Sequence, residues 1–345
     1  DMFGLIAADD AASANLRRIK ETLGAGPAGA MTLISRLTRI SSLAIPRASI
    51  LYFPLQMLFL WDVHVLQALE RWKRANGSRS RSWLEAAGEW EALAALAILA
   101  HDHPEWAMPE LDEAQESLEA SGLAHPLIAP ESAVPNDVTV GPAGTFLFVT
   151  GSNMAGKSTL LRAVGVNAVL AMAGAPVCAR SLRMPPVDVW TCMRVEDSVA
   201  RGVSFFMAEL QRLKLVVDAC TNARERPVLY LLDEILQGTN TGERQIASRR
   251  VLAQLTATSS LGAISSHDLD LVTGTHLDDL ARKVHFAERF SRDVSGPSMT
   301  FDYRLRPGVA TSTNALALME LLGFDVSADS ESSTNAVAAS KGSDP

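Results

Sequence analysis

The segment GSNMAGKST at residues 151–159 has the residue types and spacing that hold a phosphate group. Gly151, Gly156, Lys157 and Ser158 match the pattern G-x-x-x-x-G-K-[ST], in which glycines let backbone N–H groups wrap a phosphate. The lysine would neutralise phosphate charge, and the serine hydroxyl could bind Mg²⁺. We therefore expect a nucleotide-binding loop made of Gly151, Ser152, Asn153, Met154, Ala155, Gly156, Lys157, Ser158 and Thr159.

A second group of reactive side chains follows the apolar run VLYLL. Asp233 could hold the Mg²⁺ that the loop serine also contacts, and Glu234 could position a water molecule against the γ-phosphate. Two adjacent carboxylates at a strand end are unfavourable unless a cation lies beside them. His267 follows another apolar run, where its imidazole could orient the γ-phosphate. These residues predict Mg²⁺-dependent ATP hydrolysis, with Glu234, His267 and Lys157 as catalytic residues and Ser158 and Asp233 as metal ligands.

Between these groups, the segment RVEDSVARGVSFFMAELQRLK at residues 194–214 reads as the start of an amphipathic helix. Gly202 and Ser204 stand near the helix start, where N–H groups can receive an anion. The segment DEILQGTNTGER is polar and glycine-rich, which predicts an exposed loop beside the reactive residues. The apolar face of the helix consists of Phe206, Leu210, Leu213 and Val217.

The elements that must hold these residues are indicated by apolar runs and turn residues. Prolines cluster between residues 126 and 142, which marks a boundary. Beyond it, strand and helix patterns alternate, which is typical of an α/β domain with a mostly parallel sheet. The expected strands span residues 145–150, 227–232, 261–266, 283–286 and 299–305, and a capped helix is expected at residues 312–323.

Residues 1–124 are expected to be helical throughout, because apolar residues recur at three and four positions without competing strand alternation. The most apolar stretch, residues 50–66, approaches the length of a membrane span. The stretch is interrupted by Pro54, Gln56, Asp62 and His64, and this favours a buried helix.

The segment RWKRANGSRSRSW at residues 71–83 is basic and contains the turn signal Asn76-Gly77. It predicts a tip between two long helices. A basic tip could contact nucleic acid or anionic lipid, and a solvated end of a helix hairpin explains the pattern equally well.

The composition is that of an ordinary soluble chain, with 345 residues, 48% hydrophobic content and a formal charge of −8. This charge argues against a protein that coats nucleic acid by bulk attraction, although a local basic face is compatible with it. Three irregularly spaced cysteines suit a reducing compartment rather than a disulfide framework or a zinc site. No signal-peptide pattern is visible. We expect a cytoplasmic protein, with membrane association only through a region upstream of Asp1.

The motifs of the C-terminal half, in their order, resemble those of the MutS family of DNA mismatch repair ATPases, a branch of the ABC-type ATPases. The resemblance covers about residues 125–324. Its motifs are HPLI, VPND, TGSNMAGKSTLLR, SFFMAEL, LLDEILQGTNTGER, SSHDLDL and YRLRPGVATSTNALALMELLGF. The helical half, through EWEALAALAILA followed by MPEL, is similar to the core and lever helices of that family.

The resemblance implies three regions and a homodimer. An all-α core/lever domain (1–124) would precede a P-loop, ABC-type ATPase domain (125–325), and the polar composition of residues 326–345 predicts a disordered tail. The two subunits would pair head to head and form two composite sites, each of which would bind ATP and Mg²⁺. Loop 151–159, Asp233, Glu234 and His267 would act within one subunit, and Ser204 would reach the γ-phosphate of the other subunit's nucleotide. The loop 238–242 would cross the dimer interface, and helix 313–322 would pack in the dimerisation region.

The chain departs from the family pattern in three places. The family signature has Ser-Thr before Phe-Met, whereas this chain has Ser204-Phe205. An aromatic residue that stacks on adenine often precedes Pro-Asn-Asp in the family, but Ala133 and Val134 stand there. No mismatch-reading domain is present in this sequence, and the FAE at residues 286–288 reads as a strand end.

The leading hypothesis is a MutS-like ATPase whose nucleotide cycle opens and closes a dimer and is coupled to mismatched or branched DNA. The alternative is an ABC-type ATPase motor that acts on a protein or membrane partner without DNA recognition. A transporter signature, Leu-Ser-Gly-Gly-Gln, is absent from the sequence, which counts against the transporter branch. A P-loop kinase would need an acceptor pocket and a lid, and the Asp-Glu pair and His267 do not favour it.

Overall fold

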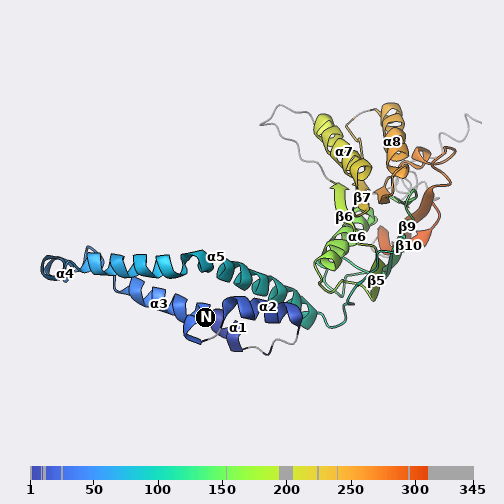
Figure 1. Cartoon of the computed structure of the whole chain (residues 1–345). Coiled ribbons are helices and arrows are strands. Elements are labelled where there is room, and N and C mark those ends of the chain that lie inside the picture. The colour runs from blue at the N-terminus through green and yellow to red at the C-terminus, as the bar shows by residue number, and fades with distance from the viewer. Residues whose placement is uncertain are drawn as a thin grey trace, which may run out of the picture. The chain divides into compact units, whose positions relative to one another are not determined.

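A computed structural model describes residues 2–8, 10, 13–24, 26–152, 154–193, 205–223, 225–238, 240–293 and 296–309. Contacts divide the chain into two compact units, Asp1–Asp102 and His103–Pro345. Figure 1 draws the elements of both units. The division between Asp102 and His103 lies about twenty residues before the expected boundary at residue 124.

The regular elements in the described part of the first unit are all helices. The helices are α1 (Met2–Ala8), α2 (Ala14–Leu23), the short 3₁₀ helix η1 (Gly26–Ala28), α3 (Ala30–Ser42), α4 (Tyr52–Phe59) and α5 (Trp61–Asp102). Ser13 caps α2, because its hydroxyl accepts the Leu16 N–H at 3.2 Å. The core of this unit is formed by buried side chains of Ile6, Ile19, Leu23, Ala30, Leu33, Trp83, Ala86 and Ala87.

Helix α5 runs without a break through the predicted tip at residues 71–83. Asn76 is buried, and its Nδ2 donates to the Trp72 carbonyl at 3.1 Å. Trp72 in turn donates its Nε1 proton to the Leu33 carbonyl on α3, at 2.9 Å. These tertiary contacts outweigh the turn preference of Asn-Gly, which is only a local tendency. The prediction of a helix end at this segment is therefore wrong.

The apolar stretch at residues 50–66 is not the buried helix that its composition favours. It forms α4 and the start of α5, which meet at Leu60 in the left-handed region, at φ 47°. None of the α4 residues is buried. Among the described residues, no helix combines the length and the apolar character needed to cross a bilayer.

In the second unit, residues expected to be helical form part of a small sheet. Its strands are β1 (Glu110–Leu111), β2 (Leu118–Leu123), β3 (Asn136–Val140) and β5 (Ser181–Met184), in the order β1-β5-β2-β3. The segment LEASGL of β2 contains good helix formers, but antiparallel pairing with both β3 and β5 makes it a strand. Partners distant in the sequence thus override local propensity here.

The central sheet has six strands in the order β10-β9-β4-β8-β7-β6. All pairs are parallel except β9 with β10, which form an antiparallel ribbon. The mostly parallel α/β sheet predicted from the sequence is confirmed. The strands are β4 (Phe146–Thr150), β6 (Asp188–Cys192), β7 (Val228–Asp233), β8 (Leu261–Ser265), β9 (Ala281–Asp293) and β10 (Gly296–Pro307).

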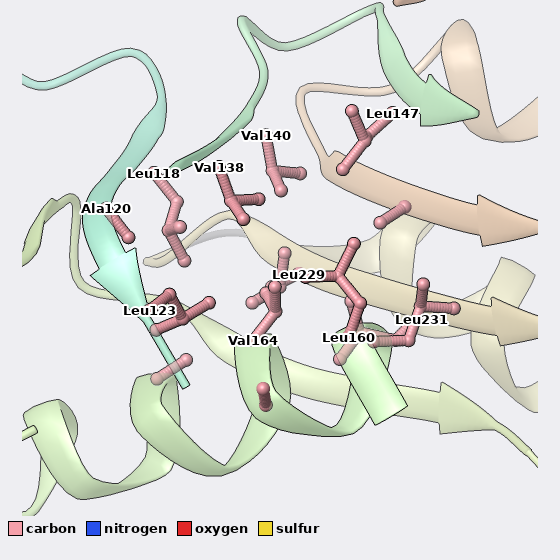
Figure 2. Close-up of a cluster of buried hydrophobic side chains, with 14 of the residues drawn as sticks. Leu118, Ala120, Leu123, Val138, Val140, Leu147, Leu160, Val164, Leu229 and Leu231 are labelled. Atoms are coloured by element: carbon pink, nitrogen blue, oxygen red, sulfur yellow. The ribbon is translucent and has the colours of Figure 1, made fainter. Parts of the chain in front are cut away.

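Helices cover both faces of this sheet. Alternate residues of β4 point to opposite faces, so that Leu147 packs with α6 (Lys157–Met172) and Phe148 packs with α7 (Phe205–Asn222) and α8 (Thr241–Thr256). Figure 2 shows the first of these clusters, in which Leu160 and Val164 of α6 meet leucines and valines of both sheets. The predicted helix at 312–323 and the tail at 326–345 lie outside the described residues.

Candidate nucleotide site

The carboxyl ends of three neighbouring parallel strands bring the candidate residues to one edge of the central sheet. In the register of β4, β8 and β7, Val149 pairs with Ser265, and Ser265 pairs with Asp233. The loop 151–159 follows β4, the Asp-Glu pair lies at the end of β7, and the segment with His267 follows β8. Crevices at the carboxyl ends of strands are the usual ligand sites of open α/β sheets.

The loop after β4 has the backbone of a phosphate cradle. Gly151 (φ 136°) and Gly156 (φ 106°) occupy the left-handed region that disfavours side chains. A Cβ on Gly151 would lie 2.9 Å from the Phe286 carbonyl oxygen, so only glycine fits there. Gly156 is the N-cap of α6, and the helix N-terminus therefore opens toward the loop. Asn153 lies outside the described residues.

Lys157 is 4% exposed and holds the loop together through its ammonium group. Its Nζ donates to the carbonyl oxygens of Gly151 at 2.8 Å and of Ser152 at 2.9 Å. The same Nζ lies 3.1 Å from Oε1 of Glu234. The structure thus joins two of the predicted catalytic residues in an ion pair between a buried lysine and a partly buried glutamate.

Glu234 is held in a left-handed backbone conformation (φ 46°), and its N–H donates to the Ser265 carbonyl at 3.1 Å. Its Oε1 also lies 3.7 Å from Nδ1 of His267, and its Oε2 accepts from the amide of Gln237. Burial by itself would raise the pKa of this carboxyl, but Lys157, Gln237 and His267 together lower it below its usual value. Glu234 is therefore ionised at neutral pH.

The remaining predicted residues are distributed around this pair. Asp233 accepts a short hydrogen bond from the Ser265 hydroxyl at the end of β8. Ser158 and Thr159 line the same cavity as Glu234, and the side chain of His267 is half exposed. A serine hydroxyl and an aspartate carboxylate are hard oxygen donors, the kind that Mg²⁺ prefers.

A cavity of about 700 Å³ lies above the loop. Its volume is in the range typical of small-molecule sites. Its lining combines the loop residues and Glu234 with a set of mainly apolar side chains. We call the apolar lining the set of Leu123, Ala124, Ile128, Ala133, Val134, Phe286 and Tyr303, and His125 and Asn136 also line the cavity.

Tyr303 is a site residue that the sequence reasoning missed. It sits at a register shift between β9 and β10, in the left-handed region at φ 52°, and is 43% exposed. Asn136 holds this bulge, because its Nδ2 donates to the Tyr303 carbonyl at 2.9 Å and its Oδ1 accepts from the Leu305 N–H at 2.7 Å. The ring edge lies beside Gly156, where an added Cβ would be 3.3 Å from Cδ1. Only the pairing of distant strands brings this aromatic ring to the loop.

His125 lines the cavity and is expected to be neutral. Burial, followed by the positive charge of Arg162, lowers the pKa of its imidazole. Its Nδ1 accepts the Leu127 N–H at 3.2 Å. A neutral imidazole beside apolar side chains suits an uncharged ring system better than a phosphate.

Glu209 is a second residue that the sequence reasoning missed. It lies on α7, is 4% exposed, and its Oε1 accepts the N–H of Leu236, in the loop that carries Glu234. Leu236 also has a left-handed backbone (φ 61°), so this hydrogen bond supports a strained turn. Oε2 of Glu209 has no hydrogen-bond partner among the described residues, and burial raises the pKa of the Glu209 carboxyl. The motif SFFMAEL contains this glutamate, and an acid in an apolar helix face was the available signal.

The residues predicted to act across a dimer are only partly described. Ser204 and Thr239 lie outside the described residues. In the rest of the loop 238–242, Asn240 caps α8 by accepting the Glu243 N–H at 2.9 Å. This cap anchors the loop beside the candidate site.

A family model described as MutS domain V matches residues 147–335, which include the loop 151–159, the Asp-Glu pair and His267.

Curated relatives match more of the chain. The DNA mismatch repair protein MSH6 of Arabidopsis thaliana is 32% identical over 217 residues, which are 60% of this chain and 16% of that protein. The DNA mismatch repair protein MutS of Haloquadratum walsbyi is 31% identical over 257 residues, covering 72% of this chain and 26% of that protein. MutS of Myxococcus xanthus is 30% identical over 274 residues, with coverages of 76% and 29%. The chain thus spans less than a third of the length of these relatives.

Proposed function

The chain belongs to the MutS family, and on that basis we propose that it is a Mg²⁺-dependent ATPase whose nucleotide cycle is coupled to DNA. The observation that carries this proposal is the contact between buried Lys157 and partly buried Glu234, with Nζ and Oε1 at 3.1 Å, on the wall of the large cavity. It joins a phosphate-binding group and a candidate base at the carboxyl edge of a parallel sheet. The relatives named as DNA mismatch repair proteins support DNA repair as the process.

In the proposed complex, the triphosphate lies in the loop 151–159 with its oxygens facing the N-terminus of α6. Lys157 contacts the phosphates and neutralises part of their charge. Ser158 and Asp233 would hold Mg²⁺, which when bound would neutralise charge on the phosphate oxygens. The donor chemistry of these two side chains fits that ion.

Glu234 would orient the water molecule that attacks the γ-phosphate in line, and would accept its proton. Its lowered pKa keeps it ionised and able to accept. A phosphate bound at Lys157 competes with Glu234 for the same ammonium group. Substrate binding would therefore release the carboxylate for its role. His267, 3.7 Å from Glu234, would orient the γ-phosphate or the carboxylate.

The apolar lining of the cavity would contact the base and sugar. Tyr303 offers a partly exposed aromatic ring next to Gly156, and neutral His125, Ile128 and Val134 also line the cavity. Stacking on a tyrosine ring is a common mode of binding for a planar base. Tyr303 would thus supply the aromatic contact that is missing before Pro135-Asn136-Asp137.

We further propose that two copies form composite sites, with Ser204 of one copy facing the nucleotide of the other. Residues 2–102 would correspond to core and lever helices that carry the motion toward DNA. The buried Glu209–Leu236 hydrogen bond supports such coupling, because it joins α7, which follows Ser204, to the loop of Glu234.

The test of the site is Glu234→Gln, with ATP binding and turnover measured separately. We expect turnover to fall about 100-fold or more while ATP is still bound, because a positioned base contributes on this scale. Glu91→Gln, on the exposed side of α5, is the matched control and leaves both unchanged. Unchanged turnover in Glu234→Gln would refute the role of this residue.

The test of DNA coupling is a titration of plain, mismatched and branched duplexes, with and without ATP, at several salt concentrations. Contacts with DNA phosphates predict binding that weakens as salt rises. Undetectable binding to all three duplexes at low salt favours the ATPase motor without DNA recognition.

A further inference from the structure

The end of the helical unit carries apolar side chains that face outward. Figure 1 draws α4 at the end of the hairpin formed by α3 and α5. We call the apolar tip the set of Ile50, Phe53, Met57, Leu58, Phe59 and Leu60, which are between 58% and 93% exposed. Single exposed apolar residues are ordinary, but six within eleven positions of one segment form a contiguous patch that signals a binding surface.

The apolar residues of α4 surround the helix rather than forming one stripe. At about 100° per residue, Phe53, Leu58 and Phe59 point in directions that differ by roughly 100° or more. A helix that docks in a protein groove usually has one apolar stripe and a polar opposite face. A helix that is apolar on every side instead suits a medium that encloses it.

Three side chains of the same segment bond within the helical unit. Tyr52 Oη donates to Asp62 Oδ2 at 3.0 Å, and Trp61 Nε1 donates to the Leu43 carbonyl at 2.8 Å. The Asp62 N–H donates to Gln56 Oε1 at 3.3 Å, whereas Gln56 Nε2 is buried without a partner among the described residues. Most of these polar groups are thus paired within the hairpin end while its apolar side chains face outward, an arrangement that a low-dielectric environment favours.

Charge around the tip favours an anionic surface. Residues 22–61 contain three arginines and no Asp or Glu, in a chain whose formal charge is −8. Arg36, Arg39 and Arg47 are exposed, and none of the ion pairs among the described residues includes them. Tyr52 and Trp61 add aromatic rings of the kind found at membrane–water interfaces.

We propose that the apolar tip inserts into the headgroup region of an anionic lipid bilayer and anchors the helical unit there without spanning it. The eight-residue α4 is on the order of 12 Å long, far too short to cross a hydrocarbon core. Apolar side chains would enter the acyl boundary, and the three arginines would contact lipid phosphates. This surface is separate from the nucleotide site, and its test requires no ATP.

The experiment is co-sedimentation of the protein with vesicles of phosphatidylcholine containing 30 mol% phosphatidylglycerol. We expect binding, and in the triple variant Phe53→Ser, Met57→Ser, Phe59→Ser a fall in the partition coefficient of at least about 30-fold. The matched control is Leu84→Ser with Ile98→Ser, which removes two exposed apolar residues of α5 and leaves binding unchanged. Circular dichroism and ATP turnover, expected to be unaltered, verify that the variants fold.

A second arm replaces Arg36, Arg39 and Arg47 with glutamine. Binding to the anionic vesicles should fall about fivefold for each arginine that is replaced. This loss should become smaller as the salt concentration rises, because salt screens the attraction. Residual binding to pure phosphatidylcholine vesicles should stay the same. No binding of the parent protein to anionic vesicles overturns the proposal. So does a triple variant that binds as well as the parent. If the triple variant instead changes the particle mass in light scattering or abolishes duplex binding, the tip contacts a second copy or DNA, and the membrane assignment is wrong.

Discussion

The nucleotide-site edge of the central sheet and the end of the helical hairpin arrange polar and apolar groups in opposite ways. At the sheet edge, buried apolar strands support charged side chains that converge on a cavity, such as Lys157 and Glu234. At the hairpin end, the polar groups bond to one another and the apolar side chains face outward. An apolar run is therefore not by itself a sign of burial. What decides is whether other elements of the fold cover it.

The largest expected effect is on the free energy of unfolding, and its test compares a buried leucine with an exposed one. Leu231, on β7, is fully buried in the cluster of Figure 2, whereas Leu58 on α4 is 74% exposed. We expect Leu231→Ala to lower the free energy of unfolding by about 2–5 kcal/mol, because it leaves a cavity in the core. Leu58→Ala should change it by less than about 0.5 kcal/mol. Urea unfolding measures both, and equal effects would mean that the tip is packed within the folded chain.

Lys157→Met tests whether the buried cation serves a ligand or only the fold. The loss of the ammonium group should weaken ATP binding about 100-fold, because a phosphate loses a charged partner in a water-poor site. Lys214→Met, at an exposed lysine of α7, should bind ATP as the parent does. Titration with a fluorescent ATP analogue measures the affinity. An unchanged affinity in Lys157→Met would remove the basis for the proposed site.

Glu209 tests the link between α7 and the loop of Glu234. Glu209→Ala leaves the Leu236 N–H without its acceptor and should lower the free energy of unfolding by about 1–3 kcal/mol. Glu209→Gln keeps an acceptor oxygen and should be close to neutral or stabilising near pH 7.

The pH dependence of these variants follows from the raised pKa of Glu209. The protonated form is favoured in the folded state, so the penalty of ionisation is absent below the unfolded-state pKa near 4.5 and grows as pH rises through the folded pKa. The stability of Glu209→Gln relative to the parent should therefore increase from pH 4 to pH 7. A constant difference over this range would contradict a buried ionised carboxylate.

The smallest expected effect is a change in ATP affinity on altering Tyr303, in the apolar lining of the cavity. Tyr303→Ala should weaken ATP binding about five- to tenfold, whereas Tyr303→Phe keeps the ring and should have little effect. Inorganic triphosphate, which has no base, provides the control and should bind equally to all three proteins. If triphosphate binding also falls in Tyr303→Ala, the ring supports the loop through Gly156 and does not stack on the base.

Local sequence patterns predicted many elements of the second unit, His103–Pro345. The strands 145–150, 227–232 and 261–266 were predictable because strands buried on both faces are short, unbroken apolar runs. The loop and the Asp-Glu pair were predictable because a phosphate cradle needs glycines and a lysine at defined spacing. The strands β1, β2, β3, β5 and β6 were not predicted, since they are short and pair with segments distant in the chain.

What the sequence by itself determined is which polar side chains follow β4, β7 and β8, and that they meet at one edge, because parallel strands place their carboxyl ends at one edge wherever they pair. Only the tertiary structure decided that Tyr303 lies beside the loop, that Glu209 supports the turn of Glu234, and that α5 passes through Asn76-Gly77. It also left the apolar residues of α4 uncovered. These outcomes depend on contacts between segments far apart in the chain, and such contacts outweigh local preferences of about 1 kcal/mol per residue.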